Sequence, residues 1–338
     1  MECMTENGGY AAGFRENRRD RATMQSVIPD AIEVDDIAKQ FGEVRALDGV
    51  SFGVARGTVL GLLGPNGAGK TTAVRILTTT MRPDRGRASV LGLDVDHDAQ
   101  RVRESIGLAG QYAAVDESLT GSENLWMMGR LTHLSQSASR SRSKELLVRF
   151  GLDDAGDRQV KTYSGGMRRR LDLAAALVHR PSVLFLDEPT TGLDPRSRRG
   201  LWDVIGELVA DGTTLLLTTQ YLEEADRLAD RIVVIDQGQV IAEGTSAQLK
   251  ARIGTTIIEA VFADPASAEG ARTLLAPLGE LTDADDGRAL SLQVNTGPRS
   301  IMDAVGALER AAIEPLTLAV REPTLDDVFL RLTGQRVE

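Results

Sequence analysis

The chain of 338 residues is long enough for two domains that each bury a hydrophobic core. Its net charge of −10 at pH 7 argues against a general nucleic-acid-binding protein, and a single cysteine, Cys3, excludes an internal disulfide. Because no apolar stretch approaches the roughly 20 residues of a membrane helix, and no signal-peptide core is present, we expect a chain that stays inside the cell and forms no pore itself.

Residues 1–30 are polar, contain Gly and Arg, and have no hydrophobic periodicity. We expect a disordered leader there, with the physiological start at Met4 or Met24. From about residue 31 to residue 108 strand patterns dominate, interrupted by a helix that runs through Ala73 to Leu77.

The most informative stretch follows the apolar run from Val59 to Leu63 and reads G-P-N-G-A-G-K-T-T. This position predicts a phosphate-binding loop between a strand and a helix, although a flexible turn is the alternative in a Gly-rich chain. Glycines let backbone N–H groups curl around nucleotide phosphates, Lys70 reaches the β- and γ-phosphates, and Thr71 holds Mg²⁺. The predicted nucleotide-binding residues of the loop are Gly64, Pro65, Asn66, Gly67, Ala68, Gly69, Lys70, Thr71 and Thr72.

Residues 112–162 have helical patterns without strand-like alternation, which predicts an α-helical subdomain. Within it, the apolar cluster from Trp126 to Met128 is interpreted as core, with a docking surface as the alternative. The stretch from Ser135 to Ser143 alternates Ser and Arg and is expected to be a solvated helix connection without function.

A glycine pair opens the next predicted helix, in the sequence Tyr163-Ser-Gly-Gly-Met167. Ser164 is a natural helix N-cap, and Gly165 and Gly166 would expose backbone N–H groups at the positive helix end, as in an anion site. An ordinary helix-start turn is the alternative. Of the arginines from Arg168 to Arg170, most are interpreted as a solvated helix face.

The apolar run from Ser182 to Leu186 ends in two carboxylates, Asp187 and Glu188. A buried strand would deliver them to the carboxyl edge of a sheet, with a solvated acidic strand end as the alternative. Because adjacent strand residues point to opposite faces, the two acids should do different work. We assign Asp187 to Mg²⁺ and Glu188 to the water that attacks the γ-phosphate.

In this order the motifs resemble those of ATP-binding cassette (ABC) proteins, the ATPase subunits of ABC transporters. The phosphate loop matches the Walker A motif, Tyr163–Met167 the LSGGQ signature, and Val183–Pro189 the Walker B strand. The resemblance covers about residues 31–250. It implies an α/β fold of the P-loop NTPase class, with a RecA-like core and an α-helical subdomain at about 112–162.

The resemblance implies further site residues. Thr191–Asp194 matches the D-loop, which adds Asp194 to the nucleotide-binding residues. Gln111 fits the Q-loop, whose Gln contacts Mg²⁺ and faces the membrane partner. Phe41 fits the aromatic residue that stacks on adenine, and a core aromatic is the alternative reading.

The resemblance also implies partners and cofactors. In the family two ATPase subunits meet head to tail and bury two ATPs, with Ser164 and Gly166 of one closing over the ATP of the other. We therefore expect a homodimer that uses ATP and Mg²⁺ and binds a separate polytopic membrane permease at the cytoplasmic face of the membrane, with no nucleic acid.

One position departs from the family pattern, because Gln220 stands where a His is expected. The histidines of the chain, His97, His133 and His179, all precede the Walker B strand, so none can take that position. Gln220 can donate a hydrogen bond to a γ-phosphate oxygen but cannot carry positive charge or relay a proton. We predict slow rather than absent hydrolysis, with Glu188 as the base.

The segments Tyr163–Arg170, Thr218–Asp226 and Glu322–Leu330 resemble the daunorubicin/doxorubicin-resistance type of exporter ATPase, in which Gln at this position is usual. That resemblance implies export of a drug, an antibiotic or a lipid. A non-transport ABC ATPase that acts on ribosomes or DNA, and a nucleotide-gated switch with little turnover, are the alternatives.

Residues 251–338 lack these motifs, and their pattern predicts the order β-α-β-β-α-β. This order indicates a small α+β, ferredoxin-like accessory domain, interpreted as an assembly or dimerisation module. Leu325, Val328 and Phe329 fall at i, i+3 and i+4 of a terminal helix and form one apolar stripe. We expect this stripe to dock onto a neighbouring subunit.

Overall fold

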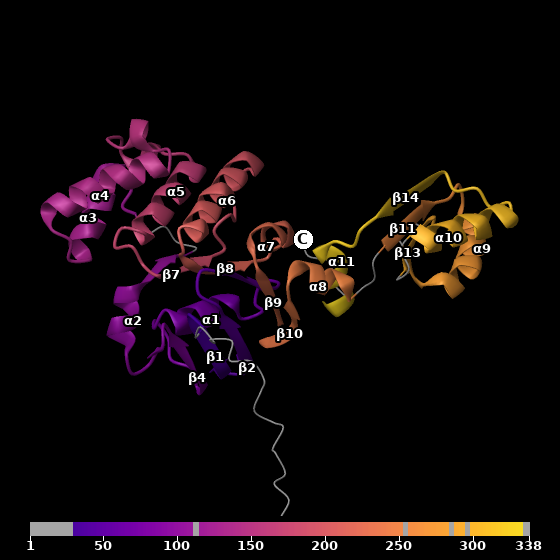
Figure 1. Cartoon of the computed structure of the whole chain (residues 1–338), viewed down its shortest axis with the longest axis horizontal. Helices are drawn as coiled ribbons and strands as arrows, with labels where there is room; N and C mark the ends of the chain where they lie inside the picture. Colours follow the sequence, from indigo (N-terminus) through magenta and orange to yellow (C-terminus); the bar gives the residue numbers. More distant parts are fainter. Residues whose placement is uncertain (1–29, 111–114, 253–255, 284–286, 295–297, 334–338) are drawn as a thin grey trace, which may run out of the picture.

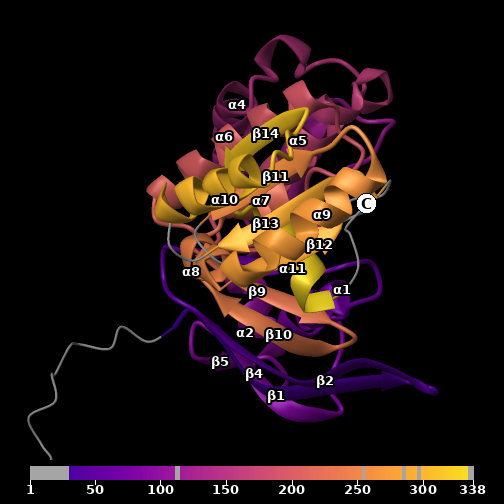
Figure 2. The same cartoon turned by 90° about the vertical axis from the view of Figure 1, so that its right-hand side faces the viewer.

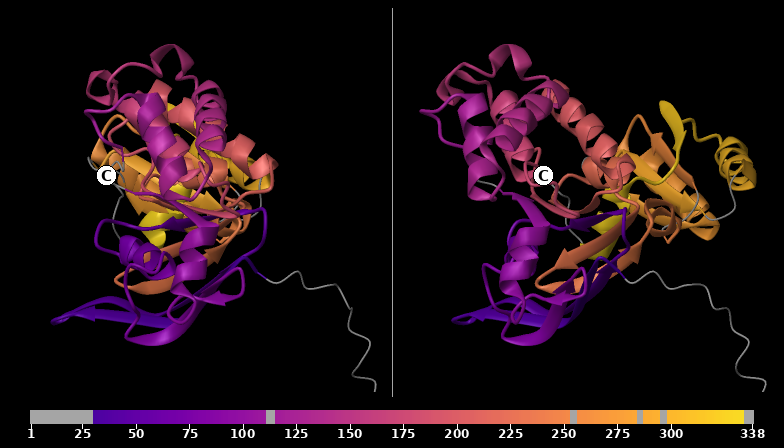
Figure 3. Two further views of the ribbon diagram at one scale, coloured as in Figure 1. Left: turned by 90° about the vertical axis from the view of Figure 1, so that its left-hand side faces the viewer. Right: turned by 60° about the vertical axis from the view of Figure 1, so that its left-hand side comes forward.

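The computed structural model describes residues 30–110, 115–252, 256–283, 287–294 and 298–333. Figure 1 shows a helical subdomain above a strand-rich core, with a C-terminal unit beside the core. The two views of Figure 3 show the same order, with the helices above the N-terminal strands. No helix within the described ranges is both long enough and apolar enough to cross a membrane.

A six-stranded sheet, in the order β10-β9-β3-β8-β7-β6, forms the centre of the core. Its strands are β3 (Val59–Leu63), β6 (Ile106–Ala109), β7 (Val183–Asp187), β8 (Thr214–Thr219), β9 (Arg231–Asp236) and β10 (Gln239–Gly244). All pair in parallel except β10 with β9. Every residue of β3, β7 and β8 is buried, because a parallel sheet is covered on both faces and favours unbroken apolar runs.

A second, antiparallel sheet in the order β2-β1-β4-β5 flanks the first. It consists of β1 (Ile32–Phe41), β2 (Val44–Val54), β4 (Arg85–Val90) and β5 (Leu93–Asp94). Between the sheets lie α1 (Lys70–Leu77) and α2 (Ala99–Ser105), whose apolar residues join one core cluster with Phe52, Phe185 and Val233. The α/β class predicted from the sequence is confirmed.

The helical subdomain contains α3 (Gly121–Leu131), α4 (Gln136–Arg149), α5 (Gly165–Ala176) and the short helices η1 (Asp153–Ala155) and η2 (Val160–Thr162). Most side chains from Ser135 to Ser143 are exposed, as predicted, but the segment is not a connection: Ser135 caps α4, and Ser139 and Ser143 are buried on its inner face. Ser139 packs closely on Gly129: a Cβ added to Gly129 would lie 2.7 Å from the Oγ of Ser139. Small side chains therefore let α3 and α4 approach each other.

The core reading of the cluster from Trp126 to Met128 is also wrong for its largest member, since Trp126 is 36% exposed. Leu125 and Gly129 are the buried residues of this part of α3, and Met128 packs only partly against the core. The helix turns its Trp outward, because positions 125 and 129 are four apart and share the inner face.

After β8 the chain forms α7 (Leu222–Leu228) and, past β10, α8 (Ser246–Ala251); α6 (Pro195–Ala210) precedes β8. The C-terminal unit then follows the predicted order, with β11 (Thr256–Val261), α9 (Pro265–Leu275), η3 (Ala276–Leu278), β12 (Glu280–Asp283), β13 (Ala289–Val294), α10 (Pro298–Arg310), β14 (Thr317–Arg321) and α11 (Leu325–Thr333). Its strands form an antiparallel sheet in the order β12-β13-β11-β14. Figure 2 views the chain from the side of this unit.

The predicted apolar stripe does not face a neighbouring subunit. Leu325, Val328 and Phe329 of α11 are each 3% exposed and pack against α7 and α8 of the same chain. Figure 1 shows α11 beside α8, between the core and the rest of the C-terminal unit. The periodicity predicted the stripe correctly, but the apolar surface that covers it comes from α7 and α8, which lie far away in the sequence, and periodicity cannot reveal such a partner.

Replacing Phe329 by Ala should release α11 from the core. The ring is buried, and truncation of a buried Phe typically costs about 3 kcal/mol or more. We expect faster proteolytic cleavage within residues 317–333 and a lower urea midpoint. Leu330→Ala, at an exposed neighbouring position, is the control and should resemble the parent. Identical behaviour of the two variants would contradict the docking.

Candidate functional site

The predicted phosphate loop connects β3 to α1 at the carboxyl edge of the parallel sheet. Gly69, just before α1, has φ +107°, a conformation that side chains rarely adopt. A Cβ on Gly69 would also lie 2.3 Å from the carbonyl oxygen of Ala46, so only glycine fits. The remaining predicted loop residues, from Gly64 to Ala68, precede it, and Thr72 lies in the first turn of α1.

Lys70 is the buried cation of the site, with its side chain 4% exposed. Its Nζ donates to the carbonyl oxygens of Gly64 at 2.7 Å and Pro65 at 3.0 Å, and lies 3.3 Å from Glu188 Oε1. Burial lowers the pKa of the Lys70 ammonium, and the charge and hydrogen bond of Glu188 oppose that shift. The loop and Glu188 together hold the positive charge in place.

Asp187 ends β7 and is 5% exposed. Its Oδ1 accepts from Thr218 Oγ1 at 2.6 Å and from Thr71 Oγ1 at 3.3 Å. A hydroxyl and a carboxylate at this separation are hard oxygen donors of the kind that Mg²⁺ prefers. Thr71 and Asp187 therefore fit the metal-binding role expected of them.

Glu188 lies between the phosphate loop and the segment that follows β7. Its N–H donates to the carbonyl oxygen and the Oγ1 of Thr218, at 3.1 and 3.0 Å. Its Oε2 accepts from Thr191 Oγ1 at 3.3 Å, while Oε1 faces Lys70. The backbone φ of +51° is uncommon for a residue other than glycine, so these contacts hold Glu188 in an unfavourable conformation.

Sequence reasoning missed the contacts of Thr218 and Thr191. Thr218 pairs with Asp187 across the parallel strands β7 and β8, a register that motif spacing does not give. A signal was available, because Thr218 and Thr219 are polar residues at the end of an otherwise apolar strand, where the carboxyl edge of a sheet gathers functional groups.

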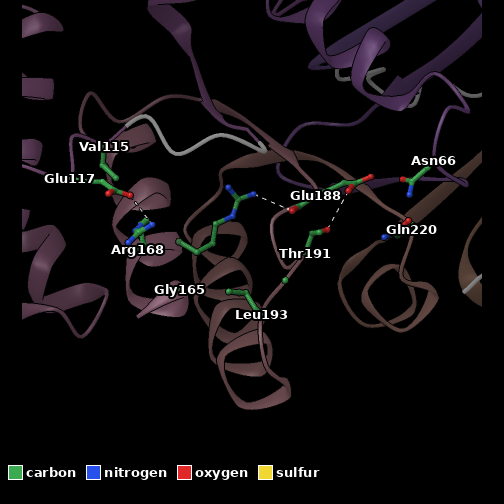
Figure 4. A pocket seen from close by; sticks show the side chains of 11 residues that line it. Asn66, Val115, Glu117, Gly165, Arg168, Glu188, Thr191, Leu193 and Gln220 are labelled. Atoms are coloured by element: carbon green, nitrogen blue, oxygen red, sulfur yellow. Dashed lines mark hydrogen bonds and ion pairs between the residues drawn. The ribbon is translucent and has the colours of Figure 1, made fainter. Parts of the chain in front are cut away.

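A cavity of about 890 Å³ opens above these residues. Its lining includes Asn66 of the phosphate loop, Glu188, Gln220, and Gly165 at the start of α5. Figure 4 shows Asn66 and Gln220 on one side of Glu188, with Arg168 and other residues of the helical subdomain on the opposite side. The cavity thus spans both subdomains, and the half-buried Gln220 lines it together with Asn66 of the loop.

The glycine pair begins α5 as predicted, and the Ser164 side chain caps the helix by accepting from Met167 N at 3.2 Å. A Cβ on Gly166 would lie 2.6 Å from Ser197 Oγ, so glycine permits close packing on the start of α6. Asp194 caps α6 and accepts from the Ser197 hydroxyl at 2.6 Å. Hydrogen bonds from Ser197 lower the pKa of Asp194.

Of the remaining predicted residues, Phe41 lies apart from this cluster. Phe41 ends β1 and is 46% exposed, so it is not the core aromatic that the alternative reading required, and Phe52 takes that role. Lys39 Nζ lies 5.8 Å from the Phe41 ring centroid. Gln111 lies outside the described residues, which end at Gly110 on this side and resume at Val115.

The interpretation of the arginine run as a solvated face is wrong for its middle member. Arg168 pairs with Glu117 at 2.8 Å, and Arg170 donates to the carbonyl oxygen of Phe150 at 2.9 Å. The Arg169 side chain is only 13% exposed and points into the core, because it belongs to the face of α5 that packs on the sheet at β6, from which its Nη2 reaches the carbonyl oxygen of Asp187.

Comparisons with known proteins agree with this arrangement. The sequence profile of the ABC transporter family matches residues 47–191. The chain is 56% identical to the daunorubicin resistance ATP-binding protein DrrA3 of Streptomyces coeruleorubidus over 90% of this chain and 96% of that protein. It is 41% identical to the Nod factor export ATP-binding protein I of Ralstonia nicotianae, over 90% and 94%.

A solved ATP-binding cassette of an ABC transporter in its ADP conformation has the same fold as the larger part of the chain. The two superpose with a TM-score of 0.59 and 27% sequence identity, covering 65% of this chain and 92% of the other.

Thr218→Val should slow ATP hydrolysis without unfolding the chain. The substitution keeps the shape but removes the hydroxyl that hydrogen-bonds Asp187 and Glu188, which is worth about a tenfold loss in kcat. Thr214→Val is the control, because it loses one hydrogen bond, to Gly57 N, at the opposite end of β8. A colorimetric phosphate assay distinguishes them; equal rates would show that Thr218 does not organise the site.

Proposed function

This chain belongs to the ABC transporter family, and on that premise we propose that it powers the export of a drug, an antibiotic or a lipid through a separate membrane permease. The chain is an ATPase of that family. The observation that carries the proposal is that Lys70 Nζ lies 3.3 Å from Glu188 Oε1 beside the cavity. This contact places a phosphate-binding cation next to a carboxylate that can act as a base.

Hydrolysis follows from the chemistry of these groups. Backbone N–H groups of the loop and Lys70 hold the β- and γ-phosphates and stabilise the charge that develops on them. Glu188 orients a water molecule and accepts its proton as the water oxygen bonds to the γ-phosphorus. The bond from that phosphorus to the bridging oxygen breaks, leaving ADP and phosphate. Gln220 donates a hydrogen bond to a γ-phosphate oxygen.

Thr71 and Asp187 would hold Mg²⁺, which neutralises phosphate charge when it is bound. Asp187 is held ready by Thr218 and Thr71, so its oxygen is positioned before the metal arrives. Gln111 is proposed to complete these contacts, and Phe41 to stack on adenine, for which its exposure is suitable.

Two copies are proposed to meet head to tail, so that Ser164, Gly165 and Gly166 of one contact the ATP held by the other. The capped start of α5 supports this role, since a helix N-terminus favours an anion. Asp194 is proposed to lie at the same interface. The dimer would close on ATP and reopen once the γ-phosphate bridge is cleaved.

The permease is proposed to carry the exported molecule and to hold the chain at the cytoplasmic face of the membrane. The name of one relative concerns daunorubicin resistance and that of another Nod factor export, which supports export but leaves the cargo open among drugs, antibiotics and lipids. Residues 251–338 are proposed to be an accessory assembly domain, anchored through α11.

Gln220→His should raise the ATPase rate at least about tenfold, because a protonated imidazole adds positive charge beside the γ-phosphate. The gain should be largest below the imidazole pKa of about 6.5 and fade as the pH rises through it. Gln237→His, at an exposed turn after β9, is the control for adding a histidine. An unchanged rate would refute the idea that Gln220 makes hydrolysis slow.

Glu188→Gln should abolish turnover, by about 100-fold or more, while ATP binding persists. Removing the base should also trap a closed dimer, visible by light scattering with Mg²⁺ and ATP. Turnover equal to the parent would refute Glu188 as the base.

The same trapped variant tests the export role. Tagged and isolated from membranes of its source, it should co-purify with a polytopic membrane protein. Association with ribosomes or DNA instead would overturn the transport proposal in favour of a non-transport ATPase.

A further inference from the structure

Arg169 connects the helix that begins at the glycine pair to the backbone around Glu188. Its Nε donates to the carbonyl oxygen of Pro189 at 2.7 Å, and its Nη2 to those of Asp187 at 3.3 Å and Glu188 at 3.2 Å. Its Nη1 donates to the carbonyl oxygen of Gly110. One guanidinium thus spans two segments that follow neighbouring strands, β7 and β6.

Burying the Arg169 guanidinium costs free energy unless its N–H groups are hydrogen-bonded and its charge is paired. Burial lowers the pKa of the Arg169 guanidinium, and the charge of Asp172, whose carboxylate lies 3.3 Å from Nη1, opposes the shift. Asp172 is itself 2% exposed. A buried ion pair of this kind adds little stability compared with apolar residues of the same size. We therefore explain the presence of Arg169 by the fixed geometry in which its guanidinium holds several carbonyl groups.

Glu188 is the residue that this geometry serves. Its φ of +51° is unfavourable for glutamate and persists only where the surroundings fix it. Thr218 fixes the peptide before Glu188 through the N–H, and Arg169 fixes the carbonyl groups on both sides of its Cα. The direction in which the Glu188 side chain leaves the backbone is therefore set in part by α5.

We propose that Arg169 is a positioning residue that aims the Glu188 carboxylate at the attacking water and ties that aim to the position of α5. The inference rests on the proposed function, in which the start of α5 contacts the ATP of the partner subunit. A shift of α5 on closing would move the Arg169 guanidinium and, through it, the base of the chain's own site. Arg169 would thereby link the two ATP sites of the dimer.

The test compares Arg169→Lys with Arg170→Lys in the full-length chain. Lysine keeps the charge but cannot span the carbonyl groups of both segments. We expect Arg169→Lys to lower kcat by about 10- to 100-fold, as small misplacements of a catalytic group do, with KM for ATP within about twofold of the parent. Arg170→Lys changes only contacts to the carbonyl oxygens of Phe150 and Gly151, away from Glu188, and should keep kcat.

Rescue separates positioning from a merely structural role. In Arg169→Ala, free guanidinium at millimolar concentration should restore part of the turnover, whereas Arg170→Ala should gain nothing. Should both Arg169 variants fail to fold, Asp172→Asn retains Arg169 but weakens its charge partner, and should lower kcat to a smaller extent with KM unchanged.

Equal kcat for Arg169→Lys and the parent would overturn the inference, as would a loss confined to KM, or an Asp172→Asn variant with unchanged kcat. These outcomes leave the proposed function intact as long as the parent hydrolyses ATP and Glu188→Gln does not. A parent chain without turnover would count against the proposed function itself.

Discussion

The contact between Lys70 and Glu188 depends on the order of strands in the parallel sheet. An isolated charge with less than a tenth of its surface exposed is costly, so each group needs a partner of opposite charge or several polar contacts. The sheet supplies both, because β3, β8 and β7 are neighbours and their carboxyl ends meet. The phosphate loop follows β3, and Glu188 follows β7. At the end of β8 between them, the carbonyl oxygen of Thr219 accepts from Gly64 N at 3.3 Å, and that of Thr218 accepts from Glu188 N at 3.1 Å.

The unfavourable backbone conformation of Glu188 is held by contacts from several segments of the chain. Thr218 fixes its N–H, Thr191 contacts its carboxylate, and Arg169 fixes the adjacent carbonyl groups. These residues come from β8, from the segment before α6, and from α5. The position of the Glu188 carboxylate therefore depends on both the core and the helical subdomain. A displacement of one relative to the other would change that position.

The motifs of the site could be predicted because each is contiguous in the chain. Local spacing alone is enough to identify the phosphate loop and the paired carboxylates. The contacts that hold them could not, since Thr218 meets Asp187 only through strand register. Arg169 was within reach: it precedes Asp172, Leu173 and Ala176 by three, four and seven positions, the spacing of one buried helix face. Because Arg169 is charged, it was assigned to the solvated face of the helix in spite of this spacing.

The motif-based boundary at residue 250 is not where the packing of the ATPase core ends. The cluster that holds Leu325, Val328 and Phe329 also contains Leu63 and Leu222. Leu63 immediately precedes the phosphate loop, and Leu222 lies two residues after Gln220. The last described helix of the chain, α11, therefore shares one hydrophobic cluster with the residues that flank the phosphate loop and Gln220. In terms of packing, α11 belongs to the core, and β11 to β14 form the part that stands outside it.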